Sequence, residues 1–291
     1  MNGGDMRILV LGATGMLGHE AVRVLAERFE VQATARDVER ARALGVSAAL
    51  HELEASEAHA LPELLTAAAP DVVLNCVGIV KQLEEASRPI PSINVNSLLP
   101  HRLEEACAAQ GARLIHVSTD CVFSGRLAPP GLYTEDEVPD PVDLYGRSKL
   151  LGEVAGEGAL TLRTSIIGWE PERASGLLEW LVSQAGRPIR GFANAIFSGL
   201  TTRALSRVVE EVILEAPRLS GLYHVSAEPI TKLELVTLLD EALELGCEIE
   251  PAEEPHINRA LDSSRFRRAT RIEIPSWDCM VAELSEERQR A

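Results

Sequence analysis

Three glycines, each three residues after the last, follow the first apolar segment and constrain the fold more than any other feature. Residues 8–11 are apolar, Gly12, Gly15 and Gly18 come next, and a helical pattern of apolar residues starts at Leu17. This order predicts a strand, a tight turn and a helix. Gly12 would permit the turn, and Gly15 would let a pyrophosphate approach the backbone. Gly18 would let the helix pack closely on the strand. A glycine-rich turn of an unrelated α/β domain is the alternative, but the flanking strand and helix favour a dinucleotide site at the helix N-terminus.

Apolar strands and amphipathic helices alternate through the first half of the chain. Strands are expected near residues 31–35, 46–50, 71–78, 114–120 and 160–163. The alternation predicts a Rossmann-type, doubly wound parallel sheet of the α/β class, whose ligands collect at the carboxyl ends of the strands. After residue 168 the pattern loosens. We therefore predict a dinucleotide-binding domain at 1–168 and a smaller substrate-binding lobe at 169–291, and leave open a return of the chain between them.

The end of the second strand bears on the choice of cofactor. An acidic residue there binds a ribose 2′-hydroxyl, whereas an arginine can hold a 2′-phosphate. Arg36 precedes Asp37, so the sequence favours NADP(H) over NAD(H). A surface arginine beside a solvated aspartate is the alternative. At the end of the fourth strand, Val77 and Gly78 are expected near the nicotinamide ribose.

A tyrosine and a lysine four residues apart form the candidate catalytic centre. Tyr145 and Lys149 would lie on one helix face, about one turn apart. A nearby ammonium lowers a phenol pKa, so the tyrosine could act as a general acid towards a carbonyl oxygen. Thr119, at the end of the fifth strand, is expected to hydrogen-bond that carbonyl. An ordinary amphipathic helix would explain the Tyr–Lys spacing alone, but its order after the glycine turn and Ser118-Thr119 makes the pattern specific.

These motifs resemble the extended short-chain dehydrogenase/reductases, most closely the dTDP-4-dehydrorhamnose reductases and related sugar-nucleotide reductases. The matching segments occupy residues 12–18, 118–125, 145–153, 162–165 and 261–266 and keep the family's order. The resemblance implies NADPH-dependent reduction of a nucleotide-linked 4-keto-6-deoxy sugar, with Tyr145 as proton donor and Lys149 as its support. Residues implied to bind cofactor are Gly12, Thr14, Gly15, Met16, Leu17, Gly18, Arg36, Leu53 (by the adenine), Val77, Gly78, Tyr145 and Lys149. Residues expected to contact the substrate are Ser118, Thr119, Arg163 and Ser165.

Three positions depart from the family pattern. Cys121 stands where the family has tyrosine, Ile166 stands where tryptophan often follows, and the fourth strand runs into Val77–Lys81 instead of a run of small residues. Because these positions are expected near the sugar or nicotinamide, they leave the identity of the sugar open.

The acidic composition limits the classes of partner. With a net charge of −16, the chain is not expected to bind nucleic acid or an anionic membrane, and no segment is long enough to span one. Its five cysteines and seven histidines have no metal-ligand spacing, so we expect no metal and a cytoplasmic protein with reduced thiols. A nucleotide-diphosphate sugar is the expected ligand, and a homodimer is compatible with the sequence. In the second lobe Asn194 is a candidate sugar or base contact, and six cations are candidate diphosphate ligands or surface charges: Arg187, Arg190, Arg203, Lys232, Arg259 and Arg265.

Two other functions compete with the reductase. An epimerase, dehydratase or decarboxylase would retain NAD tightly, but Arg36 suits a dissociable NADPH. A non-catalytic regulatory subunit could keep the same fold, but it would not need the complete set of Thr119, Tyr145 and Lys149.

Overall fold

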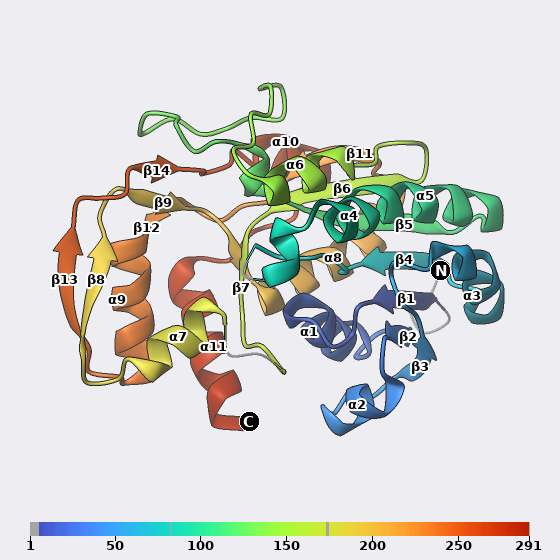
Figure 1. Ribbon diagram of the computed structural model, residues 1–291, viewed down its shortest axis with the longest axis horizontal. Coiled ribbons are helices and arrows are strands. Elements are labelled where there is room, and N and C mark those ends of the chain that lie inside the picture. The colour runs from blue at the N-terminus through green and yellow to red at the C-terminus, as the bar shows by residue number, and fades with distance from the viewer. Residues whose placement is uncertain (1–5, 82, 173–174, 291) are drawn as a thin grey trace.

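Seven parallel strands form the central sheet of the computed structural model, which describes residues 6–81, 83–172 and 175–290. The strands are β1 (Arg7–Leu11), β2 (Glu30–Ala35), β3 (Ala49–Glu52), β4 (Val72–Asn75), β5 (Arg113–Thr119), β6 (Ala159–Thr164) and β11 (Gly221–His224). Their spatial order is β11-β6-β5-β4-β1-β2-β3 (Figure 1). The chain runs outward from β1 to β3 and then starts again at β4, so the strand order reverses between β1 and β4. This confirms the predicted doubly wound sheet and puts the ligand crevice at that reversal.

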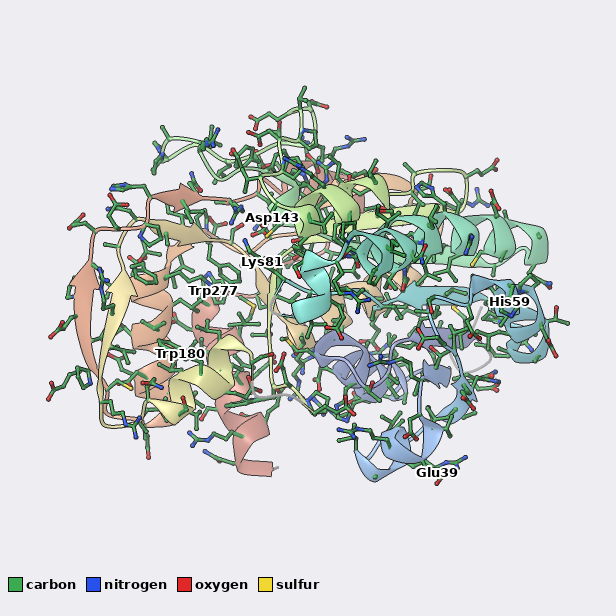
Figure 2. All side chains as sticks on the ribbon, viewed as in Figure 1. Glu39, His59, Lys81, Asp143, Trp180 and Trp277 are labelled. Carbon is green, nitrogen blue, oxygen red and sulfur yellow. The ribbon has the colours of Figure 1, made fainter. Side chains whose placement is uncertain are left out.

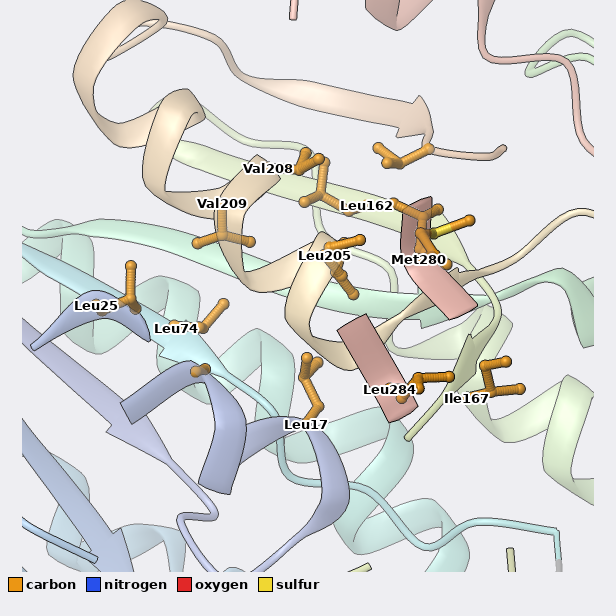
Figure 3. Packing of buried hydrophobic residues seen from close by; sticks show 14 of the residues in the cluster. Leu17, Leu25, Leu74, Leu162, Ile167, Leu205, Val208, Val209, Met280 and Leu284 are labelled. Atoms are coloured by element: carbon orange, nitrogen blue, oxygen red, sulfur yellow. The ribbon is translucent and has the colours of Figure 1, made fainter. Parts of the chain in front are cut away.

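Helices cover both faces of the sheet because side chains alternate along each strand. Ile8 and Val10 of β1 pack with α1 (Met16–Leu25) and α8 (Thr202–Glu215). Leu9 and Leu11 face the opposite core with α3 (Leu61–Ala68) and α5 (Leu99–Gln110). Figure 3 shows the first core, where Leu17 and Leu25 of α1 and Leu205 and Val209 of α8 lie near Leu74 and Leu162 of the sheet.

Shorter elements connect the layers near the carboxyl edge of the sheet. They are α2 (Val38–Ala43), η2 (Ala58–Ala60), η3 (Glu84–Ser87), α4 (Pro89–Ser92), the π-helical η4 (Ile93–Leu98), η5 (Asp120–Val122) and α6 (Leu144–Leu151). Within the described ranges, no helix has both the length and the apolar character needed to cross a lipid bilayer.

A smaller lobe is built from the second half of the chain. It contains α7 (Leu177–Ser183), β8 (Pro188–Phe192), β9 (Ala195–Phe197), β12 (Ile230–Thr231), α9 (Lys232–Leu243), β13 (Glu248–Ala252) and β14 (Ile257–Asn258), with sheets ordered β12-β9-β14 and β13-β8. Between β9 and β12 the chain returns to the main sheet, where α8 packs on α1 and β11 pairs with β6. The lobe is therefore discontinuous in sequence, which is the return of the chain that the sequence analysis left open.

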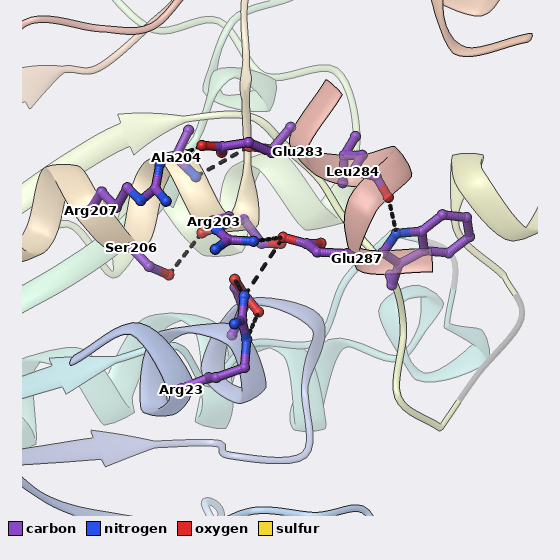
Figure 4. Close-up of polar contacts among 12 residues, drawn as sticks. Arg23, Arg203, Ala204, Ser206, Arg207, Glu283, Leu284 and Glu287 are labelled. Carbon is purple, nitrogen blue, oxygen red and sulfur yellow. Dashed lines mark hydrogen bonds and ion pairs between the residues drawn. The ribbon is translucent and has the colours of Figure 1, made fainter. Parts of the chain in front are cut away.

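The last helix, α11 (Trp277–Arg290), joins the two parts of the molecule. It packs on α9 of the lobe and on β10 (Leu200–Thr201), which pairs with β7 (Ile166–Ile167). Figure 4 shows Glu287 of α11 facing Arg203 of α8 and Arg23 of α1. The ion pairs measure 3.4 Å to Arg203 and 3.8 Å to Arg23. The helix α10 (Ser264–Thr270) precedes it and packs on β11. The lobe is thus fixed to the dinucleotide domain on the side away from β3.

Candidate active site

The glycine turn has the geometry expected of a dinucleotide cradle. Gly12 has a φ of +86°, which favours glycine, and a Cβ on Gly18 would lie 2.1 Å from the Gly12 carbonyl oxygen. The first and third glycines are therefore required for the turn and for the packing of α1 on β1. Gly15 is the exposed N-cap of α1, has no capping side chain, and is followed by no acidic residue in the first turn. Free N–H groups and the helix dipole at this end fit a pyrophosphate.

The residues after β4 lie beside this turn. A Cβ on Gly12 would come within 3.1 Å of the Val77 side chain, and one on Gly78 within 3.5 Å of Asn96. Asn96 accepts a bond from Ile79 N at 2.8 Å and donates to Ile79 O at 3.0 Å and to Ser148 of α6 at 3.1 Å. Asn96 thus joins the loop after β4 to α6, which carries Tyr145 and Lys149, a role the sequence pattern did not reveal.

A surface pocket of about 350 Å³ lies between the glycine turn and the end of β2, where the adenosine of a dinucleotide is expected; it is lined by Thr14, Arg36, Asp37, Arg40 and Glu172. Asp37 caps α2 by accepting a bond from Arg40 N at 2.9 Å, so its carboxylate is already engaged. Arg36 is exposed, and Arg40, which the sequence pattern did not single out, pairs with Glu172. The pocket therefore offers two guanidinium groups where a 2′-phosphate is expected.

Leu53 departs from its expected role beside the adenine. It is only 6% exposed and packs in the core formed by β1, α3 and α5. Little of its side chain remains for contact with a ligand.

The candidate catalytic side chains meet where β5 ends. Thr119 is the last residue of β5, and its hydroxyl acts on the phenol of Tyr145 on α6, where it lowers the pKa of that phenol. Gly146 allows this approach, because a Cβ there would lie 2.2 Å from the Cys121 carbonyl oxygen. Asp143 caps α6 by accepting a bond from Gly146 N at 2.8 Å, and it pairs with Lys81 at 2.7 Å. Figure 2 labels Lys81 and Asp143, whose side chains lie close together. The N-terminal end of α6 is thus fixed to β5 and to the loop after β4.

The charge state of Tyr145 differs from the prediction that Lys149 lowers its pKa. Burial raises the pKa of Tyr145 above its ordinary value, with Cys121 and Asp120 acting in the same direction. Lys149 instead donates to the Val117 carbonyl at 2.7 Å, and burial lowers its own pKa to about 8. The prediction was wrong because the ammonium is held by the strand. The phenol keeps its proton, as a general acid requires.

A buried polar chain extends from Lys149 into the sheet. Its Nζ lies 3.5 Å from His116 Nε2, and His116 Nδ1 lies 3.1 Å from the Asn75 amide nitrogen. Burial and the Lys149 charge lower the pKa of His116 well below its ordinary value, so His116 is neutral. Asn75 and His116 therefore orient Lys149, and only strand pairing brings them together.

Two predicted substrate contacts are corrected by the structure. Ser118 donates to Glu153 at 2.7 Å, and Arg163 forms a buried ion pair with the same carboxylate at 2.7 Å. The two residues are neighbours across β5 and β6, so one buried carboxylate satisfies both. Their polar groups serve the interior of the protein instead of an open cleft.

The other two predicted contacts lie in different places. Ser165 directly follows Thr164, the register partner of Thr119, so it lies at the same sheet edge as Thr119. Asn194 lies between β8 and β9 and donates to Glu253 at 2.9 Å within the small lobe. Over the described residues, no three His, Cys, Asp or Glu side chains group in a way that could hold a metal ion.

Comparison with known proteins identifies the family of the chain. The family model described as "RmlD substrate binding domain" matches residues 6–290. A probable low-salt glycan biosynthesis reductase from Haloferax volcanii is 30% identical, covering 77% of this chain and 75% of its own length. A dTDP-4-dehydrorhamnose reductase from Burkholderia thailandensis is 28% identical over 94% of this chain and 95% of its own. Methionine adenosyltransferase 2 subunit beta of Xenopus tropicalis is 29% identical over 82% and 72%.

The fold has close counterparts among solved structures. The dTDP-4-dehydrorhamnose reductase of Bacillus anthracis, solved in complex with NADP, superposes with a TM-score of 0.81 at 19% identity, covering 97% of this chain and 99% of that one. The chain therefore belongs to the RmlD substrate binding domain family, among the extended short-chain dehydrogenase/reductase-like sugar-nucleotide reductases, and is an NAD(P)-dependent oxidoreductase as the motifs predicted.

Proposed function

We propose that this protein reduces the keto group of a nucleotide-linked 4-keto-6-deoxy sugar with NADPH. The observation that carries the proposal is the packing of α6, which carries Tyr145, against the Cys121 carbonyl two residues after Thr119 at the carboxyl end of β5. The family supports sugar-nucleotide reduction, and its dTDP-4-dehydrorhamnose reductase members support the keto-sugar class.

Each candidate side chain has a separate role at the substrate carbonyl group. Thr119 would bind the carbonyl oxygen, and Tyr145 would donate a proton to it as the bond is reduced. Lys149, oriented by His116 and Asn75, would hold the cofactor ribose and replace the proton that Tyr145 loses. The nicotinamide, when bound, supplies the hydride.

The cofactor preference rests on the adenosine pocket. Arg36 and Arg40 line it together, and the carboxylate of Asp37 is engaged in capping α2. Charge-assisted hydrogen bonds from guanidinium groups to a phosphate are strong and geometrically specific. The pocket therefore favours NADPH over NADH.

The proposal is tested by following NADPH oxidation against a panel of nucleotide-linked 4-keto-6-deoxy sugars that differ in nucleotide and in sugar. We expect at least one member to be reduced, and reduction to be lost in Thr119→Val. If NADPH binds but none of the panel is reduced by the wild type, the substrate class is wrong.

A non-catalytic role is the second candidate, favoured by the similarity to methionine adenosyltransferase 2 subunit beta. A regulatory subunit would need the surface of the fold but not the phenol of Tyr145. Loss of turnover without loss of the biological role in Tyr145→Phe would favour this second candidate.

A further inference from the structure

The pocket between the glycine turn and the end of β2 is lined by two carboxylates as well as two guanidinium groups. Asp37 caps the helix α2 that carries Arg40, so its carboxylate belongs to the local structure of that helix. Glu172 instead comes from the segment between β7 and α7, and its carboxylate pairs with the guanidinium of Arg40. Because a carboxylate repels a phosphate, a pocket that serves only to bind a 2′-phosphate would not need Glu172.

Glu172 is held in place more firmly than Arg40. The side chain of Glu172 is 16% exposed, whereas that of Arg40 is 63% exposed. Before Glu172 in the chain, Glu170 N donates to the Glu179 carboxylate of α7 at 2.6 Å. After it, Ser175 N donates to the Glu170 carboxylate at 2.8 Å. Because these bonds fix the segment to α7, Arg40 is the partner that can exchange one anion for another.

A 2′-phosphate would compete with Glu172 for Arg40. Guanidinium groups bind phosphate through strong paired hydrogen bonds, whereas a surface ion pair contributes little to stability. NADPH can therefore take Arg40 from Glu172, but it must break the ion pair and leave its phosphate beside an unpaired carboxylate. NADH has a hydroxyl in place of the phosphate and leaves the ion pair intact. The carboxylate of Glu172 thus lowers the affinity for NADPH alone.

We propose that Glu172 is a positioning residue that sets cofactor specificity through Arg40: by pairing with Arg40 it weakens binding of the 2′-phosphate and narrows the difference in affinity between NADPH and NADH. It does so without contact with the ribose. The oxidised cofactor NADP⁺ carries the same phosphate, so the pairing also speeds its release. This inference rests on the proposed use of NADPH and deepens it.

The inference can be tested without a sugar substrate. Adenosine 2′,5′-bisphosphate and adenosine 5′-monophosphate differ only in the 2′-phosphate, and calorimetric titration of the full-length protein gives the Kd of each. We expect Glu172→Gln to tighten binding of the bisphosphate about 3- to 10-fold, because Arg40 is released and one negative charge is removed, and to leave the Kd of the monophosphate unchanged. Unchanged or weaker binding of the bisphosphate to folded Glu172→Gln would overturn the inference. Weaker binding of the monophosphate would also overturn it, because Glu172 would then bind the ribose.

Two further variants show whether the effect passes through Arg40. Glu39→Gln is the matched control, since it removes the same charge from the residue next to Arg40, but Glu39 pairs with Arg42. It should leave the Kd of the bisphosphate unchanged. In an Arg40→Ala background, Glu172→Gln should change that Kd by less than about twofold, because no ion pair is left to break. Equal tightening with and without Arg40 would show that Glu172 repels the phosphate directly, which would overturn the inference.

The same variant separates this inference from the proposed function. During turnover, Glu172→Gln should lower the KM for NADPH and leave the KM for NADH unchanged, whereas a fault in the folding of the segment would raise both. A wild type that binds the two adenosine nucleotides equally would contradict the proposed preference for NADPH. The inference about Glu172 would then stand if Glu172→Gln creates a preference for the bisphosphate, and it would fail if the variant also binds both equally.

Discussion

At the scale of single residues, the account depends on Tyr145 as the proton donor. Its side chain is half-buried, and desolvation raises the pKa of the phenol, so the phenol stays protonated. Tyr145→Phe removes the proton without removing the ring, so we expect kcat to fall about 100- to 10,000-fold, the usual contribution of a general acid. Steady-state NADPH oxidation measures this, with thermal unfolding as the control for folding. A variant that folds and keeps wild-type turnover would exclude Tyr145 as the donor.

Arg36 is the residue that should separate the two nicotinamide cofactors. It lines the adenosine pocket, and Asp37 beside it is engaged in capping α2. Arg36→Ala should raise the KM for NADPH about 10- to 100-fold, the range expected for a lost charge-assisted bond, and leave the KM for NADH nearly unchanged. Arg40→Ala is the matched variant and should have a smaller effect, because Arg40 also pairs with Glu172. Equal changes in the KM for NADPH and for NADH in Arg36→Ala would mean that Arg36 does not bind the 2′-phosphate.

At the scale of elements, the packing of α6 against η5 sets the distance between Tyr145, on α6, and Thr119, at the end of β5. A Cβ on Gly146 would lie 2.2 Å from a backbone oxygen of Cys121, so Gly146→Ala must push the helix away from η5. We expect a loss of stability of about 1–3 kcal/mol, as for other overpacking substitutions, and a clear fall in kcat. Gly156→Ala is the control, since its Cβ would meet only the flexible end of Glu104. Similar kcat values for both variants would mean that α6 tolerates movement without loss of function.

Sequence patterns predicted elements where the signal is local, and failed where tertiary pairing decides. The glycine turn and the spacing of Tyr145 and Lys149 belong to single elements, and both were predicted in the right place. The third strand begins at Ala49 instead of residue 46, because the Val46 N–H bonds the Ala41 carbonyl and closes α2. The pairing of Ser118 with Arg163 and the bond from Ser118 to the buried Glu153 could not be predicted from hydrophobic periodicity. For the same reason, the sequence did not predict the contacts that link Lys149 to His116 and His116 to Asn75.

At the scale of the whole molecule, two buried histidines in the central sheet should make the fold sensitive to acid. His116 of β5 and His224 of β11 are fully buried, and burial lowers the pKa of His224 to about 4 and that of His116 well below its ordinary value. The unfolded chain binds protons at these histidines below about pH 6.5, whereas the folded chain does not. Stability should therefore fall as the pH falls from about 6.5 to 4, by about 3 kcal/mol for His224 alone.

Urea unfolding at pH 7 and pH 5 measures this loss. His224→Gln should be less stable at pH 7, because its ring bonds Tyr133 and Arg163, but should lose less stability on acidification. A loss equal to that of the wild type would mean that His224 is not the titrating group.

The central claim is that hydride passes to the sugar carbon whose oxygen meets Thr119 and Tyr145. The most direct measurement is product analysis by NMR and mass spectrometry after turnover with NADPH deuterated at the transferring position of C4. The account predicts one deuterium at C4 of the sugar, present with wild type and absent with Tyr145→Phe in the same time. Deuterium at another carbon, or consumption of NADPH with no deuterium in the sugar, would contradict it.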